Sequence, residues 1–237
     1  MMAVVMAGGE GSRLRPLTTT IPKPMVPVAN KPIIGHIFNL LRKSNIGDAV
    51  VTLCYLPDFI KDYLGNGASS GVNVSYSMED RPLGTAGSVK NLENDLDETF
   101  IVLSGDLLTD IELSEIVKFH EKKGSSVTIA LTRVPNPVEY GIVTTDREGR
   151  ITSFLEKPEW GQVFTDTVNT GIYVLEPDVL KHVPKDKPFD FSKDLFPILM
   201  REKEQIYGFI ADGYWSDIGD IEQYQQANYD ALLGHVK

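Results

Sequence analysis

The sequence predicts an α/β protein with a three-layer αβα, Rossmann-like arrangement around a mixed, mostly parallel sheet. Two observations support this class. Up to about residue 131, short apolar runs alternate with amphipathic segments, as in repeated strand–helix units. From about residue 140, short strands are separated by turns, which indicates a small substrate-binding β lobe added to the same sheet. At 237 residues with 42% hydrophobic residues, the chain is long enough for one large domain.

The first half alternates five expected strands with four expected helices. Apolar runs predict strands at 3–6, 49–54, 72–76, 100–103 and 127–131. A helix over 32–43 carries an apolar face, and Pro32 suits its first turn. Helices over 57–64 and 111–123 are closed by Gly65 and Gly124, and a further helix begins at Thr85. Ligands of such sheets gather at the carboxyl ends of the strands.

The second half is richer in strands. Strands are expected at 141–144, 151–155, 168–174 and 206–210. A helix over 189–203 with an internal Pro197, and an amphipathic helix over 221–233, complete the chain. No repeat or low-complexity segment interrupts this pattern, so we expect a single domain, 1–237.

Charge and cysteine content exclude several classes. The net charge of −10 argues against nucleic-acid binding, although residues 1–47 carry +5 and residues 48–237 therefore carry −15. The longest apolar runs are too short for a membrane span, and the first basic residue, Arg13, comes too late for a signal peptide. The single cysteine, Cys54, forms no internal disulfide. We expect a cytoplasmic protein that has no membrane partner.

Residues 7–27, AGGEGSRLRPLTTTIPKPMVP, are the most informative segment. Three glycines follow a buried strand and are flanked by cations, a combination that lets backbone N–H groups close on a polyphosphate. The P-loop pattern is absent, because Arg13 and Leu14 stand where it requires Lys and Ser or Thr. The dinucleotide-binding pattern fails as well, since Leu14 occupies its third glycine position.

The pattern G-G-x-G-x-R-L-x-P-L-T followed by P-K-P-M-x-P resembles the signature of the sugar-1-phosphate nucleotidyltransferases. Later segments match in the expected order: PLGTAG at 82–87, SGD at 104–106, EKP at 156–158, NTGIY at 169–173 and WSDIG at 215–219. The resemblance implies transfer of a nucleotidyl group from a nucleoside triphosphate to a sugar 1-phosphate, which releases pyrophosphate. It also implies a nucleotide-binding half at 1–135 and a sugar-phosphate-binding half with the closing helix at 136–237. Many members continue into a C-terminal left-handed β-helix, which would be absent from this chain.

The resemblance assigns roles to particular residues. Arg13 and Lys23 are implied as the catalytic cations, and Asp106 and Asp217 as the carboxylates that hold a Mg²⁺ cofactor, for which two aspartates suffice. Arg15 is equally well explained as a solvated loop residue. The implied nucleotide-binding residues are Ala7, Gly8, Gly9, Gly11, Ser12, Glu79, Gly84 and Thr85, although Thr85 has the alternative role of a helix N-cap. The implied sugar-phosphate-binding residues are Tyr140, Gly141, Glu156, Lys157 and Asn169.

The identity of the base depends on the residues before PLGTAG. Uridylyl- and thymidylyltransferases of the family commonly have Gln there, whereas this chain reads Met78-Glu79-Asp80-Arg81. A carboxylate at Glu79 would accept hydrogen bonds from guanine N1–H and N2–H₂. The chain therefore most resembles the mannose-1-phosphate guanylyltransferases, and GTP with mannose 1-phosphate are the expected substrates.

Three alternatives stay open: a UTP- or dTTP-dependent glucose-1-phosphate nucleotidyltransferase, a glycosyltransferase that uses Asp95-Leu96-Asp97 as its D-x-D motif, and a non-catalytic NDP-sugar-binding regulatory paralogue. We interpret Asp95-Leu96-Asp97 as a turn, because it precedes a strand. The four histidines have no metal-ligand spacing, and we expect His120, among charges on a helix, to be solvated. A homo-oligomer is compatible with the sequence.

Overall fold

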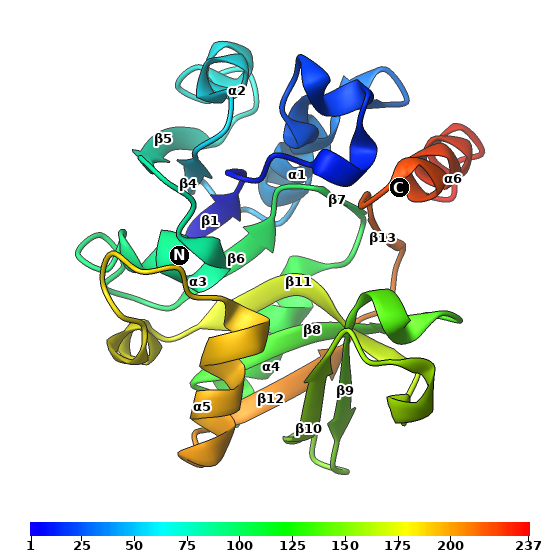
Figure 1. Ribbon diagram of the computed structural model, residues 1–237. Coiled ribbons are helices and arrows are strands. Elements are labelled where there is room, and N and C mark those ends of the chain that lie inside the picture. The colour runs from blue at the N-terminus through cyan, green and yellow to red at the C-terminus, as the bar shows by residue number, and fades with distance from the viewer. The chain divides into compact units, whose positions relative to one another are not determined.

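The computed structural model describes residues 1–237 (Figure 1), and the chain divides into two compact units. The first unit comprises Met1–Pro82, Leu103–Ile111 and Gly213–Lys237, and the second comprises Leu83–Val102 and Glu112–Asp212. Each unit thus gathers segments that lie far apart in the sequence. The bounds of these units differ from the predicted halves at 1–135 and 136–237, and the single domain expected from the sequence stays a prediction.

The strands of the first unit form a parallel sheet. β1 (Met2–Met6) pairs with β4 (Asp48–Leu53), and β4 pairs with β5 (Asn73–Met78), both in parallel. The last residues of β6 (Phe100–Ser104) lie beside β1, where the Gly105 N–H donates to the Met6 carbonyl at 2.8 Å. The apolar runs that predicted these strands are buried in β1, β4 and β6. The predicted strands are confirmed.

Three helices belong to the first unit: α1 (Ile33–Lys43), α2 (Pro57–Leu64) and α6 (Ile221–Leu232). α2 ends at Gly65, as predicted, where φ is 55°. α6 packs on two short strands that the sequence did not predict, β2 (Pro27–Val28) and β13 (Trp215–Asp217). β2 pairs with β3 (Lys31–Pro32), and β13 pairs antiparallel with β7 (Leu107–Thr109).

The second unit contains a mixed sheet of β8 (Val127–Arg133), β9 (Gly141–Thr145), β10 (Ile151–Glu156), β11 (Thr167–Leu175) and β12 (Ile206–Ile210). β11 pairs antiparallel with both β8 and β9, β10 pairs antiparallel with β9, and β12 runs parallel to β8. The expected strand-rich second half is confirmed. With the parallel strands of the first unit, the chain has the predicted α/β class and mixed sheet.

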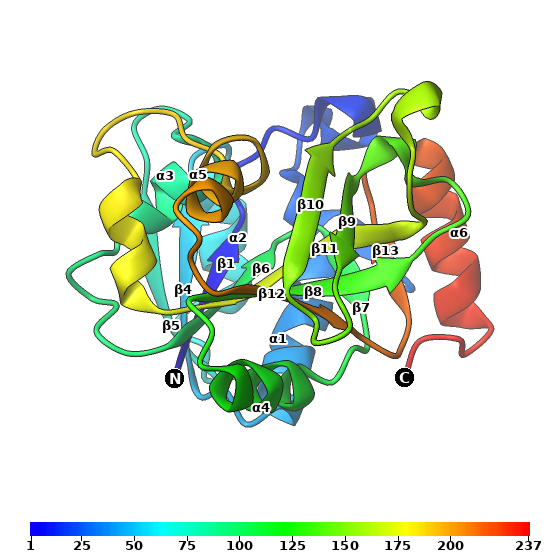
Figure 2. The ribbon, with the colours of Figure 1, turned by 90° about the horizontal axis from the view of Figure 1, so that it is seen from below.

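The helices of the second unit are α3 (Gly84–Lys90), α4 (Leu113–Lys123) and α5 (Phe196–Arg201). Figure 2 shows α4 and α5 on opposite faces of the β8–β12 part of this sheet. The single helix predicted over 189–203 is wrong in extent. The Asp190 carboxylate caps a π-helical turn, Phe191–Leu195, which leads into the shorter α5, and Pro197 lies at the start of α5, where its missing N–H costs no hydrogen bond.

The prediction that His120 is solvated is also wrong. His120 is 1% exposed, and its ring nitrogens lie 2.9 Å from Thr128 Oγ1 and 3.1 Å from Glu176 Oε1. Asp95 lies in a turn ahead of β6, as interpreted from the sequence. None of the helices has both the length and the apolar character needed to cross a membrane.

Candidate functional site

The glycine loop of the first unit continues directly from β1. The Ala7 N–H donates to the Thr52 carbonyl at 3.0 Å, which extends the β1–β4 pairing by one residue. Gly11 has φ of +63° and accepts a hydrogen bond from Thr18 Oγ1 at 2.8 Å. A Cβ on Gly11 would lie 2.7 Å from the Lys23 Cβ. Glycine is therefore required here both by backbone conformation and by the close approach of Lys23.

Lys23 joins two carboxylates that are far apart in sequence. Its ammonium donates a short hydrogen bond to Asp106 Oδ2 and lies 3.7 Å from Asp217 Oδ1. The antiparallel pairing of β13 with β7 sets Asp217 opposite Leu107, and the Ile218 N–H donates to the Asp106 carbonyl at 3.1 Å. The two unpredicted short strands thus bring the two predicted metal ligands together.

The pKa values of Lys23 and Asp106 are shifted by burial and, in the opposite direction, by their charged neighbours. Burial alone would lower the pKa of Lys23, but Asp106 and Asp217 outweigh that effect and raise the pKa above its ordinary value. Burial alone would raise the pKa of Asp106, but Lys23 and the Ser104 hydroxyl, which donates to Oδ1 at 2.6 Å, hold it low. Lysine and carboxylate are both ionised at neutral pH.

The same group fits the Mg²⁺ implied by the family resemblance. Asp106 and Asp217 already face one cation, the ammonium of Lys23, so both carboxylates reach a common position. Mg²⁺ is commonly bound by one or two carboxylates together with phosphate oxygens and water. The donor set of the first unit therefore suits that ion.

Arg13 lies close to this group. A Cβ built on Gly219 would lie 3.2 Å from both Arg13 Nη2 and Asp217 Oδ2, so both side chains approach the same glycine. Arg13 belongs to the 3₁₀ helix Ser12–Leu14, which Gly11 precedes in a left-handed conformation. Arg15 instead lies at the surface, 3.7 Å from Glu10 Oε2, in agreement with the solvated alternative.

In the first unit, Gly8 lies close to Cys54 and Glu79. A Cβ on Gly8 would lie 3.3 Å from the Cys54 Cβ and 3.8 Å from Glu79 Oε1. Glu79 is 7% exposed, and its N–H donates to the Leu53 carbonyl at 2.8 Å. Burial and the neighbouring carboxylate of Glu79 raise the pKa of the Cys54 thiol. The glycine loop and Glu79 are therefore adjacent, although 71 positions separate Gly8 from Glu79 in the sequence.

In the second unit, Gly84 and Thr85 open α3 against the segment 189–191. Gly84 has φ of +73°, and a Cβ there would lie 2.7 Å from the Phe189 carbonyl oxygen. Thr85 Oγ1 donates to Asp190 Oδ2 at 2.9 Å and accepts from the Phe191 N–H at 2.9 Å. The helix N-cap is Leu83, so the alternative role of Thr85 as an N-cap is wrong.

The predicted sugar-phosphate residues Gly141 and Glu156 are cross-strand partners in β9 and β10. A Cβ on Gly141 would lie 2.7 Å from Glu156 Oε2 and 2.8 Å from Phe154 Cζ, so glycine makes room for the carboxylate. The Lys157 N–H donates to the Tyr140 carbonyl at 3.0 Å, and Lys157 has φ of +46°. These four residues therefore form one connected end of the β9–β10 pair.

Asn169 lies in β11 beside the aromatic core of the second unit. Its amide nitrogen donates to Tyr173 Oη at 3.0 Å and Ser192 Oγ at 3.1 Å, and its oxygen accepts from the Gly171 N–H at 2.9 Å. Burial, reinforced by the Asp190 carboxylate, raises the pKa of Glu156. Asn169, Glu156 and Asp190 thus belong to one polar cluster.

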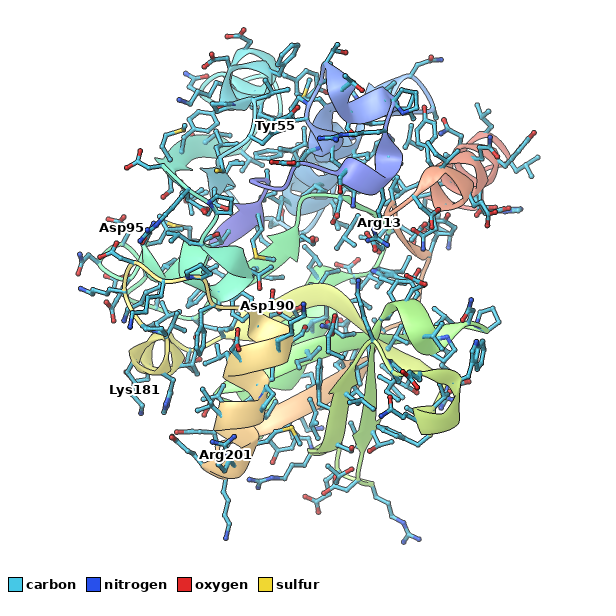
Figure 3. The ribbon with its side chains drawn as sticks, viewed as in Figure 1. Arg13, Tyr55, Asp95, Lys181, Asp190 and Arg201 are labelled. Atoms are coloured by element: carbon cyan, nitrogen blue, oxygen red, sulfur yellow. The ribbon has the colours of Figure 1, made fainter.

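Asp190 was not among the predicted site residues, yet it organises this cluster (Figure 3). Besides accepting from Thr85, it caps the π-helical turn through the Ser192 N–H at 3.0 Å. A cap signal was present in the sequence, since Asp190 precedes Ser192 and an apolar run. Its link to Thr85 spans 105 positions, and no local pattern reveals it.

Comparison with known proteins supports the resemblance seen in the motifs. The family described as Nucleotidyl transferase matches residues 2–233. A UTP–glucose-1-phosphate uridylyltransferase from Synechocystis is 37% identical over 100% of this chain and 65% of its own length. A mannose-1-phosphate guanylyltransferase from Mycobacterium tuberculosis is 35% identical over 98% of this chain and 65% of its own length. The chain thus spans just under two thirds of the length of these relatives.

Solved structures show the same fold. A putative glucose-1-phosphate thymidylyltransferase from Bacillus anthracis superposes with a TM-score of 0.88 at 24% identity, covering 98% of this chain and 95% of that one. HddC from Yersinia pseudotuberculosis, complexed with GMP-PN, superposes with a TM-score of 0.82 at 28% identity, covering 97% and 99%. With the family match over nearly its whole length, this chain belongs to the nucleotidyl transferase family.

Proposed function

We propose that this chain transfers a nucleotidyl group from a nucleoside triphosphate to a sugar 1-phosphate, giving an NDP-sugar and pyrophosphate. The observation that carries the proposal is the group in which Lys23 faces both Asp106 and Asp217, beside a glycine loop that leads to Arg13. Two cations and two carboxylates leave this group close to neutral by itself, so a bound Mg²⁺ would supply the net positive charge that a triphosphate requires.

The chemistry requires positioning more than proton transfer. An oxygen of the sugar 1-phosphate attacks the α-phosphorus, a new P–O bond forms, and the bond to the β-phosphate breaks as pyrophosphate leaves. The attacking oxygen is already ionised near pH 7, because the second pKa of a phosphate monoester is about 6. No general base is needed, so the enzyme works by bringing two polyanions into line and neutralising their charge.

In this proposal Lys23 and Arg13 neutralise the phosphates and the charge that develops on the leaving pyrophosphate. Asp106 and Asp217 hold Mg²⁺, which when bound supplies further positive charge to the phosphate oxygens. Glu156, Lys157 and Asn169 of the second unit bind the sugar 1-phosphate, with Lys157 directed to the phosphate and the others to hydroxyl groups.

GTP is the proposed nucleotide. The buried Glu79 carboxylate next to Gly8 would accept hydrogen bonds from N1–H and N2–H₂ of guanine, whereas uracil and thymine offer only one such donor, N3–H. Guanylyltransferase relatives of comparable identity support mannose 1-phosphate as the sugar substrate.

A UTP- or dTTP-dependent glucose-1-phosphate nucleotidyltransferase is the second candidate. The observation that favours it is the uridylyltransferase of Synechocystis, which is 37% identical to this chain and thus as similar as the guanylyltransferase relatives.

The test is pyrophosphate release with Mg²⁺, measured for GTP, UTP, dTTP, CTP and ATP against the 1-phosphates of mannose, glucose, N-acetylglucosamine and galactose. Release confined to GTP with mannose 1-phosphate supports the full proposal. Release with UTP or dTTP and glucose 1-phosphate supports the second candidate and removes the role given to Glu79. No release from any pair, with a folded protein, overturns both.

A further inference from the structure

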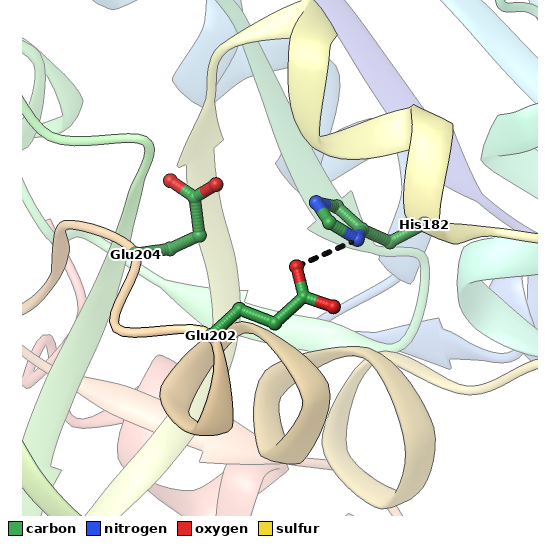
Figure 4. A group of neighbouring side chains, drawn as sticks. All are labelled: His182, Glu202 and Glu204. Atoms are coloured by element: carbon green, nitrogen blue, oxygen red, sulfur yellow. Dashed lines mark ion pairs between the residues drawn. The ribbon is translucent and has the colours of Figure 1, made fainter.

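The second unit carries a histidine and two glutamates that none of the roles above uses. His182 ends the 3₁₀ helix Pro177–His182, and Glu202 and Glu204 follow α5 (Figure 4). One ring nitrogen of His182 and one carboxylate oxygen of each glutamate lie within 4.8 Å of one another. Imidazole nitrogen and carboxylate oxygen together form a donor set that transition-metal dications, Zn²⁺ in particular, accept well.

The histidine ring is poised as a ligand. His182 Nδ1 lies 3.3 Å from Glu202 Oε2, and the side chain is 13% exposed. The other ring nitrogen, Nε2, is buried and has no hydrogen-bond partner. A buried polar atom without a partner is costly, and a cation would satisfy it. A neutral imidazole can offer the lone pair of either ring nitrogen, and in Figure 4 Glu202 lies beside Nδ1 whereas Nε2 points toward Glu204.

The loop that carries the two glutamates is held by hydrogen bonds. Lys203, between them, has φ of +61°, and in Figure 4 the Glu202 carboxylate points toward the His182 ring while the Glu204 carboxylate lies farther from it. Arg150 Nη2 donates to the carbonyl oxygens of Lys203 and Glu204 at 3.1 and 3.2 Å, which fixes the loop backbone. Ser126 Oγ donates to Glu204 Oε2 at 2.9 Å and orients that carboxylate.

A cavity lies beside Glu204, one member of this group. Its volume is about 450 Å³, and Glu204, Ser125 and Ser126 are among its lining residues. Ser125 is 3% exposed, and its Oγ has no hydrogen-bond partner. Asp97, Glu176 and Asp178 also line the cavity and outnumber its one lining cation, Lys181, so its charge favours the approach of a cation.

We propose that His182, Glu202 and Glu204 bind a transition-metal dication of the Zn²⁺ class, distinct from the Mg²⁺ site proposed at Asp106 and Asp217. Tetrahedral ligand atoms about 2.1 Å from zinc are separated by about 3.4 Å, so ligand atoms that now lie within 4.8 Å of one another would have to approach by at most about 1.4 Å. Three protein ligands leave a coordination position for water.

The test uses the full chain, freed of metal with EDTA and returned to millimolar Mg²⁺ so that the aspartate site is occupied. Zn²⁺ is then titrated by calorimetry, and Co²⁺ is added separately to record its visible absorption. We expect one equivalent of Zn²⁺ to bind and Co²⁺ to give the intense bands of a low-coordinate site. His182→Gln and Glu204→Gln should each lower the affinity for Zn²⁺ by about tenfold or more.

His235→Gln is the matched control. The His235 ring nitrogen also lies near a carboxylate, 3.2 Å from Asp230 Oδ1. His235 is exposed, however, and does not belong to a group of three possible metal ligands. The variant should bind Zn²⁺ as the wild type does. If His182→Gln does not fold, Glu202→Gln replaces it, because that side chain is 49% exposed. Wild-type protein that binds no Zn²⁺, or variants of the cluster that bind it with unchanged affinity, would overturn the proposal.

Discussion

The Lys23 ammonium donates directly to the largely buried carboxylate of Asp106, across 83 positions of sequence. Neither charge would be stable at that depth without the other, since removing one partner of such a pair leaves an uncompensated charge. Because Asp217 approaches the same ammonium, Lys23 occupies in the free protein a position that a divalent cation would share. One side chain thus stabilises the first unit and faces both carboxylates of the proposed Mg²⁺ site.

Replacing Lys23 by alanine should therefore affect both activity and stability. We expect the rate of pyrophosphate release to fall on the order of 10²–10³-fold, as for other removed charge-stabilising donors. The free energy of unfolding should fall by about 1–3 kcal/mol, because Asp106 loses a charged partner. Steady-state kinetics and urea unfolding measure the two effects.

Lys118→Ala is the matched control for Lys23→Ala. Lys118 also pairs with a carboxylate, Glu115 at 2.7 Å, but this pair is exposed at the surface. Its removal should change stability by no more than about 0.5 kcal/mol and leave the rate unchanged. Full activity in Lys23→Ala would contradict the proposed mechanism.

Glu79→Gln should alter the choice of nucleotide more than the rate. A neutral amide offers one acceptor where the carboxylate offers two, so guanine loses a charge-assisted hydrogen bond worth about 1.5–3 kcal/mol. We expect kcat/KM for GTP to fall on the order of 10–100-fold relative to UTP. Competition between the two nucleotides in one assay measures this ratio, and Asp80→Asn, at an exposed neighbouring position, should leave it unchanged. An equal fall for both nucleotides would argue against contact with the base.

Gly141→Ala should weaken binding of the sugar 1-phosphate and leave binding of the nucleotide unchanged. The added methyl group would displace the Glu156 carboxylate and press on Phe154, while the first unit keeps its contacts. We expect KM for the sugar 1-phosphate to rise on the order of tenfold or more, with KM for the nucleotide unchanged. Gly161→Ala provides the control, since a Cβ there meets no atom within 4 Å. Parallel changes in both KM values would show that Gly141 does not act through Glu156.

Much of the fold could be predicted because its signals are local. The run of apolar residues in β4 and the Gly65 that closes α2 each lie within a few positions of the structure they specify. β7 and β13 carried no such signal, because strands of three residues exist only through their pairing, which joins Thr109 to Trp215. The boundary of α5 failed for a related reason, since an apolar helical period does not distinguish a π-helical turn from an α-helix.

The candidate site likewise contains residues that local motifs predict and contacts that only tertiary structure creates. Family motifs predicted roles for Lys23, Asp106 and Asp217 one by one, but the approach of one ammonium to both carboxylates depends on tertiary structure. The cluster of His182, Glu202 and Glu204 has no motif spacing, because tertiary structure brings the segment that ends at His182 close to the two glutamates. His120 was assigned to the surface from its charged helical neighbours, whereas its hydrogen-bond partners lie on other segments of the second unit.

The buried His120 should make the protein acid-sensitive. Burial lowers the pKa of His120, only partly opposed by Glu176, so the folded protein resists a proton that the unfolded chain accepts. The stabilising contribution is therefore present above the unfolded pKa of about 6.5 and is lost as the pH falls below that value. Urea unfolding at pH 7, 6 and 5 should show a decline in the free energy of unfolding, of at most about 1.4 kcal/mol per pH unit from this residue. His120→Gln should flatten that decline while lowering stability at pH 7. An unchanged slope in His120→Gln would place the acid sensitivity elsewhere.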